Sequence, residues 1–312
     1  MVTGAGGFVG PHLVRALAAA GARVTGAGLG RPPAEVPIER WTEIDFAGEA
    51  SIEDLLAADR PDAIVHLAGQ SSAALSFQDP EGTFRANVGG TTRLLEAVRA
   101  SAPRTRVLAV STSEIYGPCA PGSRAAESAP VRPVSPYGAS KAAADAVAGA
   151  FASEHGLDVV RVRPFGHSGP GQAPRFVIPA WAQQLAAIEA EGLEPVLRVG
   201  NLAVTRDISD VRDVAVGYCA LLERASAGGA YNLCSGRGVL LSDVVLSMAQ
   251  LADVPVRVEV DPARLRPADL PYLVGDPRHT LGACGWACSI PLDRTLRDVV
   301  DEWRVRVRSG GA

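Results

Sequence analysis

A tyrosine and a lysine lie four residues apart at Tyr137 and Lys141, in the segment YGASK. On a helix, residues at this spacing share one face, so the phenol and the ammonium are expected to be neighbours. A phenol titrates near pH 10, and a nearby ammonium favours phenolate, which predicts a pKa lowered by roughly two to three units. Lys141 is the one lysine among 30 basic residues, and arginine replaces a compact ammonium poorly. The pair predicts a group that donates and accepts a proton.

Hydroxyl groups follow an apolar run at 106–110, in the segment STSEIYG that begins at Ser111. Hydroxyls at the carboxyl end of a central strand lie where doubly wound folds bind substrate. If the substrate carries a carbonyl that Tyr137 protonates, Thr112 is placed to hydrogen-bond the same carbonyl oxygen. Turns rich in Ser and Thr are also common in loops without a site, so the partner segment at Tyr137 and Lys141 carries this argument.

Gly4, Gly7 and Gly10 form a GxxGxxG spacing near the start of the chain. Glycines permit a tight turn and a close approach of the backbone to a pyrophosphate, and the amides of a helix expected over 11–20 would face that anion. The spacing is not GxGxxG, and glycine-rich turns occur without ligands, but its place between a strand and a helix favours dinucleotide binding. Because only three residues precede Gly4, the first strand is short, and we expect the true start upstream of Met1.

The end of the second expected strand bears on the choice of cofactor. An acid about 20 residues after the glycine loop would bind the adenosine ribose of NAD. The segment GAGLGR, which ends at Arg31, contains no acid. Arg31 favours a 2′-phosphate and hence NADP(H), with NAD(H) also possible, although a solvated loop residue is an equal alternative. Asp45, after the third expected strand, is a candidate for the adenine amino group or an ordinary turn residue.

Composition narrows the class of protein. A chain of 312 residues with 47% hydrophobic content predicts one large domain or two closely joined ones. The net charge of −4 without a basic stripe argues against nucleic acid or a membrane surface as partner. Five cysteines without a CxxC motif favour reduced thiols in the cytoplasm over disulfides or a metal site. No apolar run has the length of a transmembrane helix.

Strand-like runs alternate with helical patterns through the first half. This alternation predicts an α/β fold with a doubly wound parallel (Rossmann) sheet. The strands are expected at 23–25, 63–67, 106–111 and 159–163, and the helices at 11–20, 51–58, 80–101 and 137–155.

After Pro164 the pattern changes, and segments 166–179 and 261–277 are rich in Pro, Gly and Arg. We expect a dinucleotide-binding domain over 1–165, joined by 204–235. A smaller C-terminal substrate-binding lobe is expected over 166–203 and 236–308, with a helix at 242–253 that Ser242 caps. The helices at 80–101 and 137–155 are candidates for a homodimer bundle.

These motifs together resemble the extended short-chain dehydrogenase/reductase family. The similarity is greatest to its sugar-nucleotide branch, which contains GDP-mannose 4,6-dehydratases and GDP-4-keto-6-deoxy-D-mannose reductases. It covers nearly the whole chain and includes residues 2–10, 66–72, 87–91, 111–117 and 135–141. The more specific segments are 166–172, 199–202 with the following Arg-Asp pair, and 265–269. Segments 195–211 and 231–236 look more like the reductases.

The resemblance implies roles for residues that match the family motifs. The implied catalytic residues are Thr112, Tyr137, Lys141 and Glu114. The implied cofactor-binding residues are Gly4, Gly7, Phe8, Val9, Gly10, Arg31, Asp45, Phe46, Leu67, Ala68, Asn87, Ser111, Tyr137, Lys141 and Pro164. The implied substrate-binding residues are Ser71, Ser113, His167, Val177, Asn201, Arg206, Arg266 and Asp269, with Arg206 and Arg266 on the diphosphate.

The activity implied is reduction by NAD(P)H of the C4 ketone of a nucleotide-linked 4-keto-6-deoxy sugar, with GDP-D-rhamnose as product. The alternative is a 4,6-dehydratase with Glu114 as base; a 4-epimerase and a non-catalytic NADPH sensor are weaker alternatives. One departure concerns the sugar: related enzymes usually carry Asn before the histidine at 167, whereas this chain has Gly166.

Overall fold

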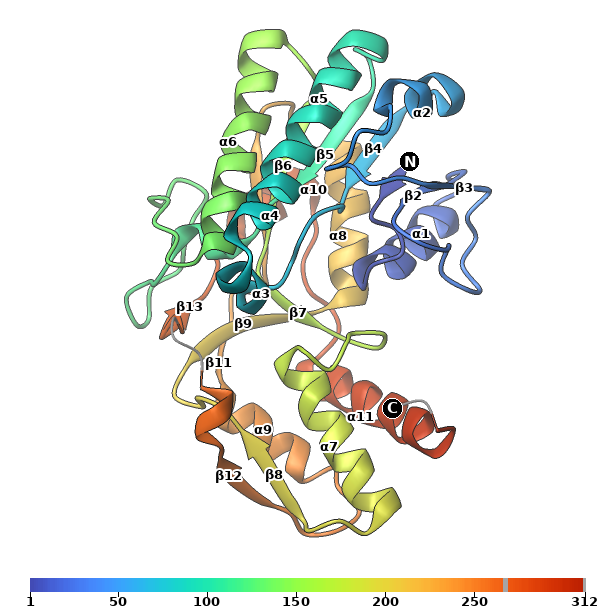
Figure 1. Ribbon diagram of the computed structural model, residues 1–312. Coiled ribbons are helices and arrows are strands. Elements are labelled where there is room, and N and C mark those ends of the chain that lie inside the picture. Colours follow the sequence, from blue (N-terminus) through green and yellow to red (C-terminus); the bar gives the residue numbers. More distant parts are fainter. Residues whose placement is uncertain (266–268, 311–312) are drawn as a thin grey trace.

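The computed structural model describes residues 1–265 and 269–310, and it forms two regions joined by a few strands (Figure 1). The larger region contains a seven-stranded sheet in the order β10-β6-β5-β4-β1-β2-β3. All neighbouring pairs in it are parallel, which confirms the expected Rossmann-like α/β fold. Its strands are β1 (Val2–Thr3), β2 (Thr25–Gly28), β3 (Arg40–Glu43), β4 (Ala63–His66), β5 (Arg106–Val110), β6 (Val159–Pro164) and β10 (Ala230–Leu233).

Helices cover both faces of this sheet, because its strands carry apolar side chains on both sides. Val65 and Leu108 face one set of helices, whereas Ile64 and Val107 face the other. The first set is α1 (Val9–Ala19), α8 (Val211–Arg224) and α10 (Arg278–Cys284); the second is α2 (Ile52–Asp59), α5 (Gly90–Ser101) and α6 (Pro136–His155).

The helix expected at 80–101 is not continuous. The chain passes from α3 (Ala73–Gln78) into α4 (Pro80–Phe84), then into a π-helical turn, η1 (Arg85–Gly89), and only then into α5. Such turns are rare and are frequent at functional sites. This one contains Asn87, which is 1% exposed.

The strand expected at 23–25 is displaced, since β2 begins at Thr25 and ends at Gly28. Glycine is a poor strand former, but here it makes room for a neighbour. A Cβ atom on Gly26 would lie 2.9 Å from the Trp41 ring and 3.1 Å from Ile38. The large side chains next to β2 therefore supply the packing that its own residues lack.

The smaller region has its own core, which includes Trp181, Leu197, Val245 and Trp303. Three helices and a two-stranded parallel sheet enclose this core. They are α7 (Val177–Glu191), α9 (Leu241–Ala249), α11 (Leu292–Arg308), β8 (Val196–Val199) and β12 (Arg257–Val260).

Four strands lie between the two regions, with β9 at their centre (Figure 1). They are β7 (Gly166–Ser168), β9 (Thr205–Asp210), β11 (Gly238–Leu240) and β13 (Tyr272–Leu273). Two short 3-10 turns complete the elements: η2 (Ser113–Tyr116) and η3 (Pro262–Arg264).

The expected N-cap at Ser242 is wrong. Helix α9 begins at Leu241, its N-cap is Leu240, and no side chain caps it. The helix starts earlier because Leu241 is buried and its amide donates to Val204 O at 3.0 Å, so packing against β9 sets the boundary. None of the helices in the part of the chain that the structure describes is long and apolar enough to cross a membrane.

Candidate active site

Two helix starts position the candidate catalytic side chains. Thr112 follows β5 and is the N-cap residue of η2, where its hydroxyl accepts a hydrogen bond from the Glu114 amide at 3.3 Å. Ser135 caps α6 by accepting from the Gly138 amide at 3.0 Å, and Pro136 occupies the first helical position. Tyr137 therefore lies in the first turn of α6, and Lys141 lies one turn later.

Thr112, Tyr137 and Lys141 meet at the carboxyl end of β5. The Tyr137 hydroxyl is hydrogen-bonded to the Thr112 hydroxyl. The Lys141 ammonium donates to the carbonyl oxygen of Val110 at 2.6 Å, and the Ser111 hydroxyl donates to the Lys141 carbonyl at 3.3 Å. Tyr137 and Lys141 are 8% and 9% exposed, so these polar groups are held by protein partners rather than by water.

The pKa of Tyr137 differs from the expectation. Burial and the Glu114 charge raise it above the usual value for tyrosine, and the hydrogen bond from Thr112 only partly opposes them. The expected lowering is wrong for the protein groups alone, because burial outweighs the groups that favour phenolate. The phenol is therefore protonated near neutral pH, which is the form that can donate a proton.

Lys141 has a shifted pKa of its own. Burial lowers the pKa of Lys141 to about 8, and Asp145, one turn further along α6, opposes that shift. Burial, with a smaller contribution from the same ammonium, lowers the pKa of His66 to about 3, so His66 is neutral. Lys141 thus titrates close to physiological pH.

Glu114 lies beside the phenol. Its side chain is half-buried, and its carboxylate accepts a hydrogen bond from the Ser135 hydroxyl at 3.4 Å. A carboxylate in this place can act as a base toward a bound substrate. Ser113, by contrast, is buried at the start of η2.

The glycine loop has the geometry that close backbone approach requires. Gly4 has a φ of +66°, and a Cβ atom on it would lie 2.7 Å from the Ala68 amide nitrogen. A Cβ on Gly10 would lie 2.1 Å from the Ala5 carbonyl oxygen, and one on Gly7 would lie 3.2 Å from Gly4 O. Only glycine fits at positions 4 and 10 without a shift of the backbone.

Helix α1 begins directly after this loop at Val9. Its N-cap residue, Phe8, makes no side-chain hydrogen bond to the first-turn amides. Those amides point out of the helix start, and the helix dipole favours an anion there. The residues present therefore suit the diphosphate of a dinucleotide.

Asn87 holds the segment that borders the glycine loop. Its side-chain oxygen accepts from the Gln70 amide at 2.9 Å, and its amide nitrogen donates to Gln70 O at 3.0 Å and to the Ser140 hydroxyl at 2.9 Å. Thr3 Oγ1 accepts from the Ala68 amide at 3.3 Å and is 2.8 Å from His66 Nδ1. Leu67 and Ala68 are half-buried, whereas Ser71, before α3, is exposed.

The remaining expected cofactor residues lie at the ends of three strands. Arg31 and Asp45 are exposed, and Asp45 Oδ1 accepts from the Ala47 amide at 2.9 Å. Phe46 is buried and packs edge-on against His66 with ring centroids 5.7 Å apart. Pro164 is buried at the end of β6, beside β10.

A cavity of about 450 Å³ lies in the smaller region, against β7 and β9. Five of the expected substrate residues line it: His167, Val177, Asn201, Arg206 and Asp269. The structure thus brings together residues that are up to about a hundred positions apart in the sequence. Ser71 and Ser113 are not among its lining residues, and Arg266 lies outside the described residues.

The same cavity contains side chains that the sequence analysis did not single out. Arg175, Phe176, Trp181 and Arg264 also line it. The Arg175 guanidinium lies 5.2 Å from the centre of the Phe176 ring. Arg175 and Arg264 lie in the two segments that are rich in Pro, Gly and Arg. This composition is the feature of the sequence that could have pointed to them. With Arg206 they give the cavity three cationic side chains, a set that suits a diphosphate.

The glycine loop touches the wall of this cavity. The rings of Phe8 and His167 are stacked with centroids 6.0 Å apart, and Phe8 also packs edge-on against His12 at 6.0 Å. His12 Nε2 is 2.8 Å from the carbonyl oxygen of Pro170. The glycine loop and the cavity are therefore adjacent.

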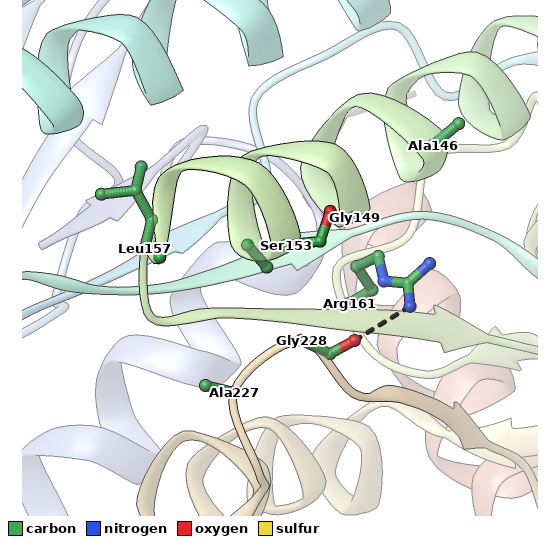
Figure 2. Close-up of a pocket in the computed structure, with 9 residues that line it drawn as sticks. Ala146, Gly149, Ser153, Leu157, Arg161, Ala227 and Gly228 are labelled. Carbon is green, nitrogen blue, oxygen red and sulfur yellow. Dashed lines mark hydrogen bonds between the residues drawn. The ribbon is translucent and has the colours of Figure 1, made fainter.

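Another cavity, of about 670 Å³, lies next to β6 and β10, at the other end of the strands from Thr112 (Figure 2). Small residues of α6 line it, together with Arg161, which donates to the Gly228 carbonyl at 3.0 Å. Leu157 and Gly228, also in its lining, precede β6 and β10. It is therefore at the amino ends of these strands, away from Thr112 and Tyr137.

Comparisons with known proteins agree with this geometry. A model of the NAD dependent epimerase/dehydratase family matches residues 1–234. GDP-6-deoxy-D-mannose reductase of Pseudomonas aeruginosa is 35% identical over 309 residues, which cover 98% of this chain and 97% of the relative. GDP-mannose 4,6-dehydratase of Vibrio cholerae is 29% identical over 82% of this chain and 76% of the relative.

Solved structures give the same result. The structure of RMD from Pseudomonas aeruginosa in complex with NADPH has a TM-score of 0.84 at 32% identity and 98% coverage of both chains. UDP-glucose 4-epimerase of Thermus thermophilus in complex with NAD has a TM-score of 0.86 at 32% identity, with 97% of this chain and 98% of that chain covered. The glycine loop, the Tyr-Lys pair and these matches agree, and the chain belongs to the NAD dependent epimerase/dehydratase family.

Proposed function

We propose that this chain is an NAD(P)H-dependent reductase that converts the C4 ketone of a nucleotide-linked 4-keto-6-deoxy sugar to an alcohol. The substrate proposed is GDP-4-keto-6-deoxy-D-mannose, and the product is GDP-D-rhamnose. The observation that carries the proposal is the buried, protonated Tyr137 beside Thr112 and Lys141, next to a glycine loop. It is supported by the similarity over nearly the full length to a GDP-6-deoxy-D-mannose reductase.

In this mechanism the nicotinamide cofactor, when bound, supplies a hydride to C4. Tyr137 donates its phenolic proton to the carbonyl oxygen, so that C=O becomes CH–OH with one hydride and one proton added. In the protein without substrate, Thr112 donates its one hydroxyl proton to the phenol. With substrate bound, Thr112 would turn that proton to the same carbonyl oxygen and fix its position. Lys141 places a positive charge near the oxygen and helps the phenol release its proton.

The cofactor proposed is NADP(H), with NAD(H) also accepted. The glycine loop and the start of α1 would hold the diphosphate, and Arg31 would contact a 2′-phosphate. Asp45, Phe46, Leu67, Ala68, Asn87, Ser111 and Pro164 complete the proposed cofactor site. Related structures were determined with both NADPH and NAD, which supports dual use.

The sugar nucleotide would lie in the 450 Å³ cavity. Arg206 and, from the sequence, Arg266 would bind the diphosphate, and Arg175 and Arg264 extend this cationic set. Asn201 and Asp269 would contact the ribose or base, and His167 and Val177 would line the wall. Ser71 and Ser113 would contact the sugar at the catalytic end.

The alternative is a 4,6-dehydratase, and one observation favours keeping it. Glu114 is half-buried beside Tyr137, where a base could remove the C5 proton of a bound 4-keto sugar. In that reaction the cofactor would be returned unchanged. The carboxylate serves equally to keep Tyr137 protonated, which is the form a reductase needs.

A cofactor-balance assay separates the two. With the 4-keto-6-deoxy sugar nucleotide and NADPH, a reductase oxidises one NADPH for each sugar reduced. With GDP-mannose alone, it forms no keto sugar. Formation of a keto sugar from GDP-mannose without net change in cofactor would overturn the reductase and support the dehydratase.

We also propose how the chain is divided between cofactor binding and substrate binding. Residues 1–165 with 204–235 would form the dinucleotide-binding domain, and 166–203 with 236–308 the substrate-binding lobe, except that α10 packs against the larger sheet. We propose a cytoplasmic homodimer that uses α5 and α6. Exposed aromatic side chains at Phe77 and Phe84, on elements that pack against α6, support an interface there.

A further inference from the structure

Glu43 lies at the carboxyl end of β3, where its exposed carboxylate reaches the turn that follows β2. Its Oε1 atom accepts a hydrogen bond from the Gly30 amide at 3.2 Å. The same glycine is held from its other side, because Trp41 Nε1 donates to Gly30 O at 2.9 Å. The turn after β2 is thus fixed by two side chains of β3, and one of them is an acid.

This turn borders the glycine loop. A Cβ atom on Gly6 would lie 3.8 Å from the Arg31 carbonyl oxygen and 3.9 Å from that of Leu29. A Cβ on Gly28 would lie 3.5 Å from Gly4 Cα. In a doubly wound sheet the ribose next to the diphosphate lies at the end of the second strand. The Glu43 carboxylate is therefore next to the position that an adenosine ribose would take.

Two opposite charges meet at this position. Arg31 follows Gly30 directly and is exposed, and Glu43 bonds to Gly30 itself. A 2′-hydroxyl can donate to a carboxylate, whereas a 2′-phosphate is repelled by it and attracted by a guanidinium. Each side chain therefore favours a different dinucleotide.

We propose that Glu43 is a specificity-determining residue that opposes Arg31 and allows this chain to accept NADH alongside NADPH. Strand β2 carries no acid, so an acid beside this turn could not be expected from the residues of β2. The parallel pairing of β2 with β3 brings Glu43 to this position. The inference rests on the proposed function only in that the chain binds a dinucleotide.

The test is the binding of NADPH and NADH, measured separately by calorimetry on the protein without sugar nucleotide. Glu43→Gln keeps an acceptor for the Gly30 amide but removes the charge. We expect the preference for NADPH over NADH to rise roughly tenfold, since a tenfold ratio needs only about 1.4 kcal/mol. Arg31→Gln should move the same ratio in the opposite direction.

Glu39→Gln is the matched control. Glu39 is also an exposed acid, but it precedes β3 at the amino end and lies 3.7 Å from Arg23. It should leave the ratio unchanged. If Glu43→Gln binds both dinucleotides with the wild-type ratio, the inference is wrong while the proposed function stands. If the wild-type protein binds neither, the proposed function fails and this inference fails with it.

Discussion

The proposed catalytic residues at the end of β5 and the cavity of the smaller region are built in different ways. Tyr137 and Lys141 are almost fully buried, and each is bonded to a residue of the segment 110–112. Arg175 and Arg264 of the cavity are exposed and come from loops or a short turn. The positions of Tyr137 and Lys141 are thus set by buried hydrogen bonds, whereas those of Arg175 and Arg264 depend on exposed loops.

This difference explains how one fold can serve several substrates. Buried polar groups must keep their hydrogen bonds, so the catalytic geometry tolerates little change. Loop arginines can be replaced without disturbing the sheet. Two solved relatives have TM-scores of 0.84 and 0.86 to this chain, so the fold is closely shared. The sugar nucleotide named for the relatives differs, however, because one is a GDP-6-deoxy-D-mannose reductase and another a UDP-glucose 4-epimerase. If the proposed function holds, the reaction depends on side chains at the end of the large sheet, and the choice of substrate depends on the cavity of the smaller region.

The largest effect is expected from the buried part. Tyr137→Phe removes the proton donor and leaves the ring, so kcat should fall by about a thousandfold, a typical contribution of general acid catalysis. NADPH affinity, measured by fluorescence titration, should change by less than about threefold. A loss of binding that matches the loss of kcat would show that Tyr137 is a structural residue instead.

Lys141→Arg tests the shape of the cation at constant charge. The guanidinium is too broad for a site where the ammonium bonds Val110 O at 2.6 Å, so we expect kcat to fall by about a hundredfold. Circular dichroism and thermal unfolding would establish that the variant is folded. Wild-type turnover would refute the role given to Lys141.

The pH dependence follows from the same buried lysine. Burial lowers the pKa of Lys141 to about 8, so its amine carries a positive charge below that pH and loses the charge above it. The value of kcat/KM for reduction should be level near pH 7 and roughly tenfold lower at pH 9. Tyr137 stays protonated through this range because its pKa is raised. A profile that stays level to pH 10 would contradict this assignment.

A smaller and different effect is expected from the cavity. Arg264→Gln should raise the KM for the sugar nucleotide about fivefold and change kcat by less than twofold, because an exposed cation contributes modestly to binding. Arg257→Gln is the control, since Arg257 is an exposed arginine of β12 that does not line the cavity. If both variants behave alike, the cavity is not the substrate site.

The sequence predicted the parts of this site that depend on local spacing. The glycine loop, the Tyr137–Lys141 pair and the strand-helix alternation are each visible in a short segment, and the fold confirmed the alternation. The direction of the Tyr137 pKa was missed because burial is not visible in a motif. Glu43 was missed because it reaches the turn after β2 only through strand pairing. Arg264 was missed because the composition of its segment points to a loop but singles out no residue.

Transfer of label from the cofactor would show directly whether a hydride reaches C4 of the sugar. The keto sugar nucleotide would be incubated with NADPH that carries deuterium at the transferable position, and the product would be analysed by NMR. We expect one deuterium at C4 of the sugar for each NADPH oxidised, with none at C5. A product without deuterium at C4, or NADPH left unconsumed while the sugar reacts, would contradict the proposed hydride transfer.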